Sequence, residues 1–128
     1  MNFQGLQAKY RRLFTENAAW RLLRADNAPY VLAFIADLFS EESEIPYGRA
    51  RIMLDAEIER SRELGFWSTE VSAATYLNQW IRNGWLREMD DSLTKTDASE
   101  IALRFCKGLD ERNSGTTASH LRIVQEAV

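Results

Sequence analysis

Apolar side chains recur at helical spacing at the start of this chain. One face of a predicted amphipathic helix over residues 4–14 carries four of them: Leu6, Tyr10, Leu13 and Phe14. The stretch from Thr15 to Asn17 interrupts the pattern. A short second helix follows, and it carries Trp20, Leu22 and Leu23.

The most apolar stretch comes next. Asp26 and Asn27 offer an N-cap, and Pro29 lies in the first turn, where its missing N–H costs nothing. The helix predicted over residues 28–40 is apolar on nearly every side, which indicates a central buried helix. Pro46 then favours a short extended piece over residues 44–46, because the residue before a proline is biased away from the helical region.

Two further helices and a hairpin are predicted up to residue 95. The first helix, over residues 47–64, turns Ala50, Leu54 and Ile58 inward and ends at Gly65 as its C-cap. Ser68 is the predicted N-cap of the second, over residues 69–83, whose apolar face is Ala73, Ala74, Leu77, Trp80 and Ile81. Two short strands around an acidic turn at residues 90–92 predict a β-hairpin over residues 85–95.

The last quarter of the chain is predicted as two helices. The first runs from residue 97 to about 111 and carries an apolar stripe with two smaller residues beside it: Ile101, Phe105 and Leu109, with Ala102 and Cys106. Asn113-Ser114-Gly115 predicts a break. The second helix covers His120 to Val128, and its pattern leads us to expect that the chain is part of a longer protein.

The order of these elements predicts the fold class. Helix, extended piece, helix, helix and hairpin follow one another from residue 28, as in a winged helix-turn-helix. We therefore predict a mainly α fold, a winged helix-turn-helix with a small β-hairpin wing and extra flanking helices. Its expected segments are an N-terminal helical lead over residues 1–26, a winged-helix core over 27–96 and post-wing helices over 97–128.

Charge separates the first 24 residues from the rest of the chain. They hold five basic side chains and one acidic side chain, a net charge of +4, whereas the whole chain has −3, which leaves −7 for the other 104 residues. A basic lead predicts an acidic or polar partner, either DNA or protein, and Lys9, Arg11 and Arg12 are the candidate DNA contacts. A solvated helix face is the alternative that the pattern leaves open.

Composition and motifs favour a non-enzymatic protein. The chain is 45% apolar and 27% charged, without an apolar run of about 20 residues or a basic and then apolar leader, so we expect a cytoplasmic protein with no membrane contact. Its one cysteine and one histidine, Cys106 and His120, supply neither a disulfide nor a metal-ligand set, and no phosphate-binding glycine motif occurs. We expect no catalytic residue, no metal and no cofactor, and we interpret Cys106 as a buried, inert thiol.

The recognition-helix position is poor in DNA-reading side chains. Residues 68–83 hold one acidic and one basic residue, and Asn78 and Gln79 are the remaining candidates for base contacts. The acidic turn at the tip of the wing would bring negative charge toward the DNA phosphates, which disfavours DNA binding. Protein association fits better, because large aromatic residues are numerous for a small core and are typical anchors of interfaces. Beside Gly65, Phe66 and Trp67 are the predicted exposed pair, whereas Trp80 is predicted to lie in the core.

Residues Ala19 to Pro29, Ala-Trp-Arg-Leu-Leu-Arg-Ala-Asp-Asn-Ala-Pro, resemble the opening motif of the JetA/MksF family, the kleisin-like subunits of bacterial Wadjet and Mks condensin complexes. Gly84 to Arg87 is similar to the wing strand of that family. The stretch from Leu109 to Arg112 is similar to the exit of its post-wing helix. The resemblance covers essentially the whole chain.

The resemblance implies an assembly module. Such a subunit joins two arms of an SMC ATPase, recruits a KITE-type subunit and works with a toprim nuclease that cuts plasmid DNA, or it serves a chromosome-organising complex. In the related MukF the N-terminal winged-helix domain dimerises, so the resemblance implies a homodimer that reaches DNA indirectly or non-specifically. The expected interface residues are Trp20, Arg21, Arg24, Phe66 and Trp67.

Two alternatives stay open at this point. The block from Trp20 to Pro29 would serve a structural role if it pinned the leading helices onto the core. The domain would belong to a different functional class if it were a DNA-binding winged helix, either a transcription regulator or a non-specific DNA contact.

Overall fold

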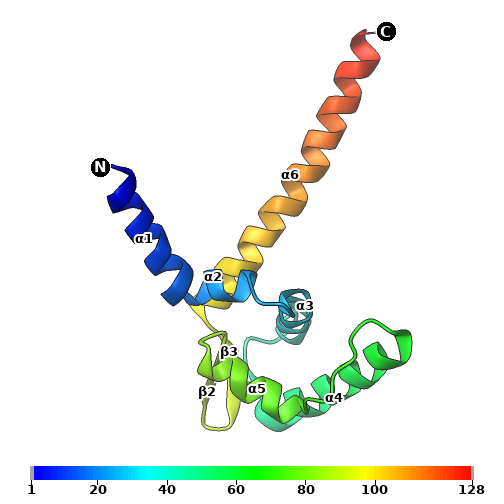
Figure 1. Cartoon of the computed structure of the whole chain (residues 1–128). Helices are drawn as coiled ribbons and strands as arrows, with labels where there is room; N and C mark the ends of the chain where they lie inside the picture. Colours follow the sequence, from blue (N-terminus) through cyan, green and yellow to red (C-terminus); the bar gives the residue numbers. More distant parts are fainter. Residues whose placement is uncertain (1, 128) are drawn as a thin grey trace.

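A computed structural model describes the backbone of residues 2–127 and the side chains of residues 2–113. Helices predominate, and the one small sheet lies below α2 and beside α5 at one edge of the molecule (Figure 1). The elements in chain order are α1 (Phe3–Glu16), α2 (Ala18–Leu23), α3 (Ala28–Leu38), β1 (Ile45–Pro46), α4 (Tyr47–Leu64), α5 (Ala73–Arg82), β2 (Leu86–Met89), β3 (Ser92–Lys95) and α6 (Asp97–Ala127).

The sheet is antiparallel, with strand order β1-β3-β2. Leu93 in the central strand pairs with Ile45 on one side and with Glu88 on the other. The β2–β3 hairpin turns through Asp90 and Asp91, both of which have a positive φ, 51° and 63°. Two consecutive left-handed residues give a two-residue hairpin the twist that its strands require.

One hydrophobic core joins α2 to α6 and the three strands, whereas α1 contributes no residue to it. The helix α3 contributes Val31, Phe34, Ile35 and Leu38 to this core. Its other face leaves Ala33, Ala36 and Asp37 exposed, so the predicted central helix is buried on one face only. The same core includes Leu22 from α2, Trp80 from α5 and Ala102 from α6. The chain from α2 to the start of α6 therefore packs as one unit.

A tight joint near Gly84 fixes α2, α5 and α6 to one another. Gly84 has a φ of +81°, which favours glycine, and the Ala18 Cβ lies 3.6 Å from the position that a Cβ would take there. The Trp85 indole N–H donates to the Ala18 carbonyl at 3.0 Å, and the Thr96 hydroxyl donates to the Gly84 carbonyl at 2.7 Å. The chain thus enters the hairpin and leaves it at the same place.

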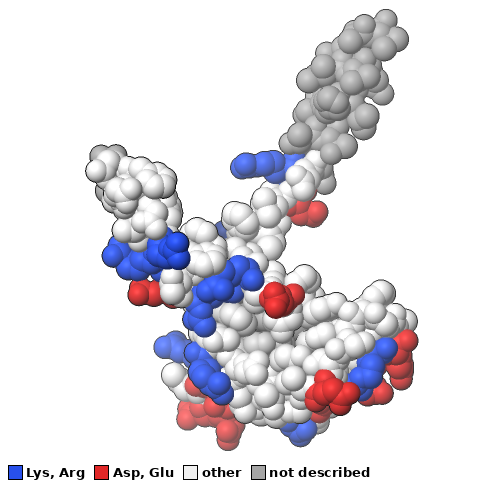
Figure 2. All heavy atoms as spheres, viewed as in Figure 1, with Lys and Arg blue, Asp and Glu red and all other residues white. Residues whose placement is uncertain are grey.

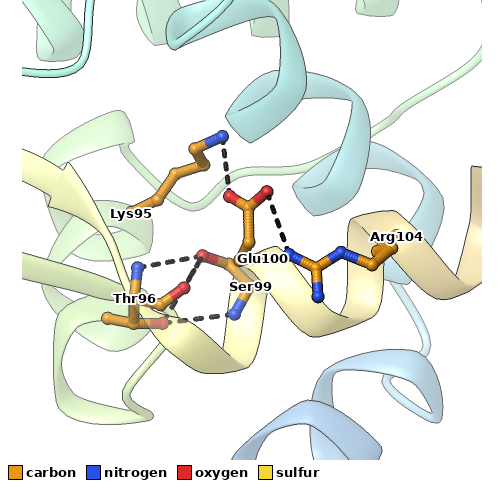
Figure 3. Close-up of polar contacts among 5 residues, drawn as sticks. All are labelled: Lys95, Thr96, Ser99, Glu100 and Arg104. Carbon is orange, nitrogen blue, oxygen red and sulfur yellow. Dashed lines mark hydrogen bonds and ion pairs between the residues drawn. The ribbon is translucent and has the colours of Figure 1, made fainter.

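Thr96 and Ser99 begin α6 with a reciprocal cap (Figure 3). The Ser99 N–H donates to the Thr96 hydroxyl oxygen at 3.2 Å, and the Thr96 N–H donates to the Ser99 hydroxyl oxygen at 3.0 Å. This arrangement satisfies two backbone donors, as a capping box does. Ser99 is fully buried.

The helix α5 begins later than the sequence predicted. Ser72, and not Ser68, is its N-cap and accepts a hydrogen bond from the Thr75 N–H at 3.1 Å. The preceding residues are held in a loop, because the Thr69 hydroxyl oxygen accepts from the Val71 N–H and also bonds the Tyr76 hydroxyl at 2.6 Å. The buried face is accordingly Ala73, Tyr76, Leu77 and Trp80, whereas Ala74 and Ile81 are partly exposed.

The final helix also differs from expectation. The backbone of α6 is helical from Asp97 to Ala127, so the predicted break at Asn113-Ser114-Gly115 and the separate helix from His120 are wrong. Helix propensity is a weak guide at a few polar positions within a long helix. None of the described helices is both long and apolar enough to cross a membrane.

Candidate protein-interaction surface

The helix α1 is amphipathic and yet buries no residue. Its N-cap is Asn2, whose side-chain oxygen accepts from the Gly5 N–H at 3.0 Å. Along its apolar face Phe3 is 74% exposed and Tyr10 is 51% exposed, while Leu6 and Leu13 are half-buried. An apolar helix face that the chain itself leaves in water is typical of a surface that another molecule covers.

Asn17 sets the angle between α1 and α2. Its backbone N–H donates to the Leu13 carbonyl and closes α1, and its side-chain oxygen accepts from the Trp20 N–H at 3.0 Å and opens α2. One asparagine thus ends the first helix and caps the second. The interruption predicted at residues 15–17 is therefore confirmed at Asn17 only, because α1 continues through Thr15 and Glu16.

Phe14, Trp20 and Arg24 form a cluster that joins the two helices. The rings of Phe14 and Trp20 meet edge to face, with their centroids 5.7 Å apart. The Arg24 guanidinium lies 4.4 Å from the centre of the Phe14 ring, and its Nε donates to the Phe14 carbonyl at 3.2 Å. The cluster holds the C-terminal end of α1 at the surface of α2.

An open groove runs along α1 and includes Phe14 and Trp20 of this cluster in its lining. We call it the α1 groove. It has a volume of about 570 Å³ and is lined by Phe3, Leu6, Gln7, Tyr10, Arg11, Phe14 and Trp20. Its lining is mainly aromatic and aliphatic and includes one glutamine and one arginine. Such a surface fits the apolar face of a partner helix better than a small polar ligand.

The helix α1 carries three cations, of which Arg11 lines the α1 groove. Lys9, Arg11 and Arg12 are all exposed, and the Lys9 ammonium lies 5.7 Å from the centre of the Tyr10 ring. Figure 2 shows basic side chains gathered over the C-terminal half of α1 and over α2, whereas the tip of the β2–β3 hairpin is acidic. The lining of the α1 groove is therefore mainly apolar, with one positively charged side chain.

The two arginines of the predicted interface have different partners. Arg21 donates from Nη2 to the side-chain oxygen of Asn83 at 2.9 Å, in a partly buried contact with the end of α5. Arg24 instead contacts Phe14. Arg21 thus ties α2 to the core and Arg24 ties α2 to α1.

The predicted exposed pair next to Gly65 is only half correct. Phe66 is 68% exposed, but Trp67 is buried. The Trp67 ring stacks on Tyr30, with ring centroids 4.8 Å apart and an angle of 2° between the planes, and it also packs against Tyr76. Gly65 in its left-handed conformation redirects the chain, so that successive side chains point outward and then inward.

A second apolar surface lies on α6 and was missed as an interface. The stripe Ile101, Phe105 and Leu109 is about half exposed, whereas Ala102 on the neighbouring face is fully buried against the core. Cys106 is half-buried, not buried as predicted. The helical spacing of these residues identified the stripe correctly but did not show that it faces solvent. Both α1 and α6 project from the α2 region (Figure 1).

Two cations lie beside the carboxylate of Glu100 at the start of α6. A hydrogen bond and the positive charge of Lys95 lower the pKa of Glu100, with a further contribution from the charge of Arg104. Figure 3 shows Glu100 between these two cations at the start of α6. Among the residues whose side chains the structure describes, no three His, Cys, Asp or Glu residues are arranged to hold a metal ion.

Comparison with known proteins identifies the family. The family model described as "Protein of unknown function (DUF3375)" matches residues 12–128, nearly the whole chain, and the chain belongs to this family. The match includes the Phe14–Trp20–Arg24 cluster and begins after Tyr10. A search of curated proteins found no match to the chain.

Proposed function

We propose that this member of the DUF3375 family is a non-enzymatic assembly domain that forms a homodimer through the α1 groove. The observation that carries the proposal is that α1 exposes a continuous apolar face while burying nothing in its own chain. A second copy would cover that face in a self-complementary contact, as two-fold dimers do. The aromatic side chains Phe3, Tyr10 and Phe14 are the residue type that anchors such contacts.

We further propose that α3 to β3 form a winged helix-turn-helix. The element order α3-β1-α4-α5-β2-β3 and the antiparallel sheet β1-β3-β2 support this assignment. In it, α5 takes the recognition-helix position and the β2–β3 hairpin is the wing. The helices α1, α2 and α6 are the flanking additions.

The wider role rests on the resemblance to the JetA/MksF family. The proposed protein is then the kleisin-like subunit of an SMC complex of the Wadjet plasmid-defence or Mks chromosome-organising type, located in the cytoplasm. Its partners would be the SMC ATPase, a KITE-type subunit and a toprim nuclease. The exposed stripe Ile101, Phe105 and Leu109 on α6 gives this proposal a second apolar surface, one that would lead toward the SMC neck.

The solution mass of the chain tests the homodimer. Light scattering across about a hundredfold range of concentration should give twice 14.8 kDa at the upper end. The double variant Phe3→Glu and Tyr10→Glu should raise the dimer dissociation constant by roughly tenfold or more, because two exposed anchors become charged. A monomer at every concentration would contradict self-association by this domain.

Ile52→Glu is the matched control. Ile52 is 62% exposed on α4, away from the α1 groove, so its replacement adds a charge at an equally exposed apolar position. It should leave the dimer unchanged. If Ile52→Glu weakened the dimer as much as the α1 variant, the interface would lie elsewhere.

DNA binding is the second candidate, and the exposed cations Lys9, Arg11 and Arg12 favour it. The helix α5 supports it less, because the Asn78 side chain already accepts a hydrogen bond from the Tyr47 hydroxyl at 3.0 Å. Three phosphate contacts predict a salt dependence with a logarithmic slope of about −2.7. Replacing the three cations by glutamine should abolish that slope if DNA is the partner. A purely protein-binding domain should show little DNA affinity at any salt concentration.

A further inference from the structure

A cavity between α3 and α4 lies away from the α1 groove. It has a volume of about 280 Å³, and α3 contributes Tyr30, Phe34 and Asp37 to its lining. Glu57 and Ser61 come from α4, and Trp67 closes one side. The volume falls just below the range of about 300–1,000 Å³ that is usual for small-molecule sites, which suits a single side chain better than a cofactor.

The aromatic wall of the cavity is fixed in place. Tyr30 and Trp67 stack in parallel, and the Tyr30 hydroxyl donates to the Phe66 carbonyl. Trp67 is held from a second direction by Tyr76, 5.2 Å away between ring centroids. A wall that is anchored by stacking and by a hydrogen bond needs little reorganisation to receive a ligand.

Two carboxylates contribute to the same cavity. Asp37 and Glu57 are exposed to solvent, so they lie at its rim, while Phe34 and Leu54 line it from the core. Within the part of the chain whose side chains are described, neither carboxylate forms an ion pair. The surrounding residues 28–64 hold eight acidic and four basic side chains, a net charge of −4. The local field therefore favours a cation.

We propose that this cavity binds an arginine or lysine side chain of a separate partner protein. Such a side chain has an apolar stem and a charged head, and the cavity offers an apolar interior with an acidic rim in the same order. A neutral apolar ligand would gain no attraction from the two carboxylates, and an anion would be repelled by them. The cavity is separate from the α1 groove, so this inference does not depend on the proposed homodimer.

The test uses the whole chain and a pair of small probes. N-acetyl-argininamide is titrated against the 15N-labelled protein while the Trp67 indole N–H resonance is followed. N-acetyl-citrullinamide is the neutral probe of nearly the same shape. The expected result is a saturable shift with the arginine probe, with a dissociation constant in the millimolar range, and less than a third of that shift with the citrulline probe.

Two double variants distinguish the effect of the rim carboxylates on binding from the effect of the net charge of the protein. Asp37→Asn with Glu57→Gln should weaken binding of the arginine probe by about tenfold, since two exposed carboxylates are neutralised at the cavity. Glu44→Gln with Glu63→Gln makes the same change in net charge at exposed positions outside the cavity lining and should leave binding within about twofold.

Three outcomes would overturn the proposal. An arginine probe that causes no saturable shift would show that the cavity takes no cationic side chain. Equal shifts with both probes would show that charge plays no part. A Trp67 resonance that moves with protein concentration alone would show that a second copy fills the cavity instead of a separate partner.

Discussion

At the scale of single residues, Arg21 and Arg24 differ in what they stabilise. Arg21 makes a partly buried hydrogen bond to Asn83, so Arg21→Ala should lower the free energy of unfolding by about 1–2 kcal/mol. Arg24 is exposed and lies over Phe14, so Arg24→Ala should cost less than about 1 kcal/mol. Urea denaturation of the two variants measures the difference.

The same two variants show whether each arginine stabilises the fold or supports dimerisation. If Arg24→Ala weakens the proposed dimer while leaving stability nearly intact, Arg24 acts by placing α1 for its partner. Equal losses of stability in both variants would instead show that both arginines serve to pin the leading helices to the core.

Glu100 forms an ion pair with Lys95 at the start of α6. Its folded pKa lies below its ordinary value of 4.5 because Lys95 donates to its carboxylate at 2.8 Å. A depressed folded pKa stabilises the folded state above the ordinary pKa, and this contribution is lost as pH falls through the folded pKa. Lys95→Met should raise the pKa of Glu100 toward 4.5, as measured by an NMR titration of its side-chain carboxyl carbon.

Arg104→Met is the comparison for that titration. The closest Arg104 nitrogen lies 3.9 Å from the Glu100 carboxylate, and its charge contributes least to the shift. It should therefore move the pKa of Glu100 less than Lys95→Met does. A larger effect from Arg104→Met would contradict the assignment of Lys95 as the principal partner.

At the scale of elements, the start of α5 can be tested by its cap. Ser72→Ala should lower the free energy of unfolding by about 1 kcal/mol, because it removes the side chain that accepts from the Thr75 N–H. Ser68→Ala should change it little, since Ser68 lies outside the helix. Chemical denaturation distinguishes the two. A greater loss of unfolding free energy in Ser68→Ala would instead support the helix start at Ser68 that the sequence predicted.

Most of the elements could be predicted from sequence because their signals are local. The αL cap at Gly65, the interruption at Asn17 and the acidic turn at Asp90-Asp91 each end or begin an element with a residue suited to that place. The start of α5 could not be fixed in this way. Ser68 and Ser72 are both good N-caps, and the choice depends on the contact between Thr69 and Tyr76.

The candidate surface was predicted less completely than the elements, because exposure depends on how the whole chain packs. Helical spacing identifies the apolar stripes of α1 and α6, but only the packing of the whole chain shows that the core leaves them exposed. Phe66 and Trp67 are neighbours of similar character, and the turn at Gly65 decides which of them is buried. Exposure at such positions is a tertiary property that residue type does not encode.

At the scale of the whole molecule, α1 should be dispensable for folding. A chain that begins at Asn17 keeps the cap of α2 and loses no buried residue, so its free energy of unfolding should fall by less than about 2 kcal/mol. Leu22→Ala, at a fully buried position, should cost about 2–5 kcal/mol in the same urea denaturation experiment. The shortened chain should also be monomeric if α1 forms the proposed interface.

The four combinations of stability and mass separate the roles of α1. A stable monomer means that α1 serves association alone. A stable dimer would show that the interface lies on another surface. The exposed apolar stripe on α6 is then the next candidate. A shortened chain as unstable as Leu22→Ala would contradict the view that α1 lies outside the core, whatever its mass. If the shortened chain is a stable monomer, folding and assembly separate at Asn17, where the first helix ends and the packed chain begins.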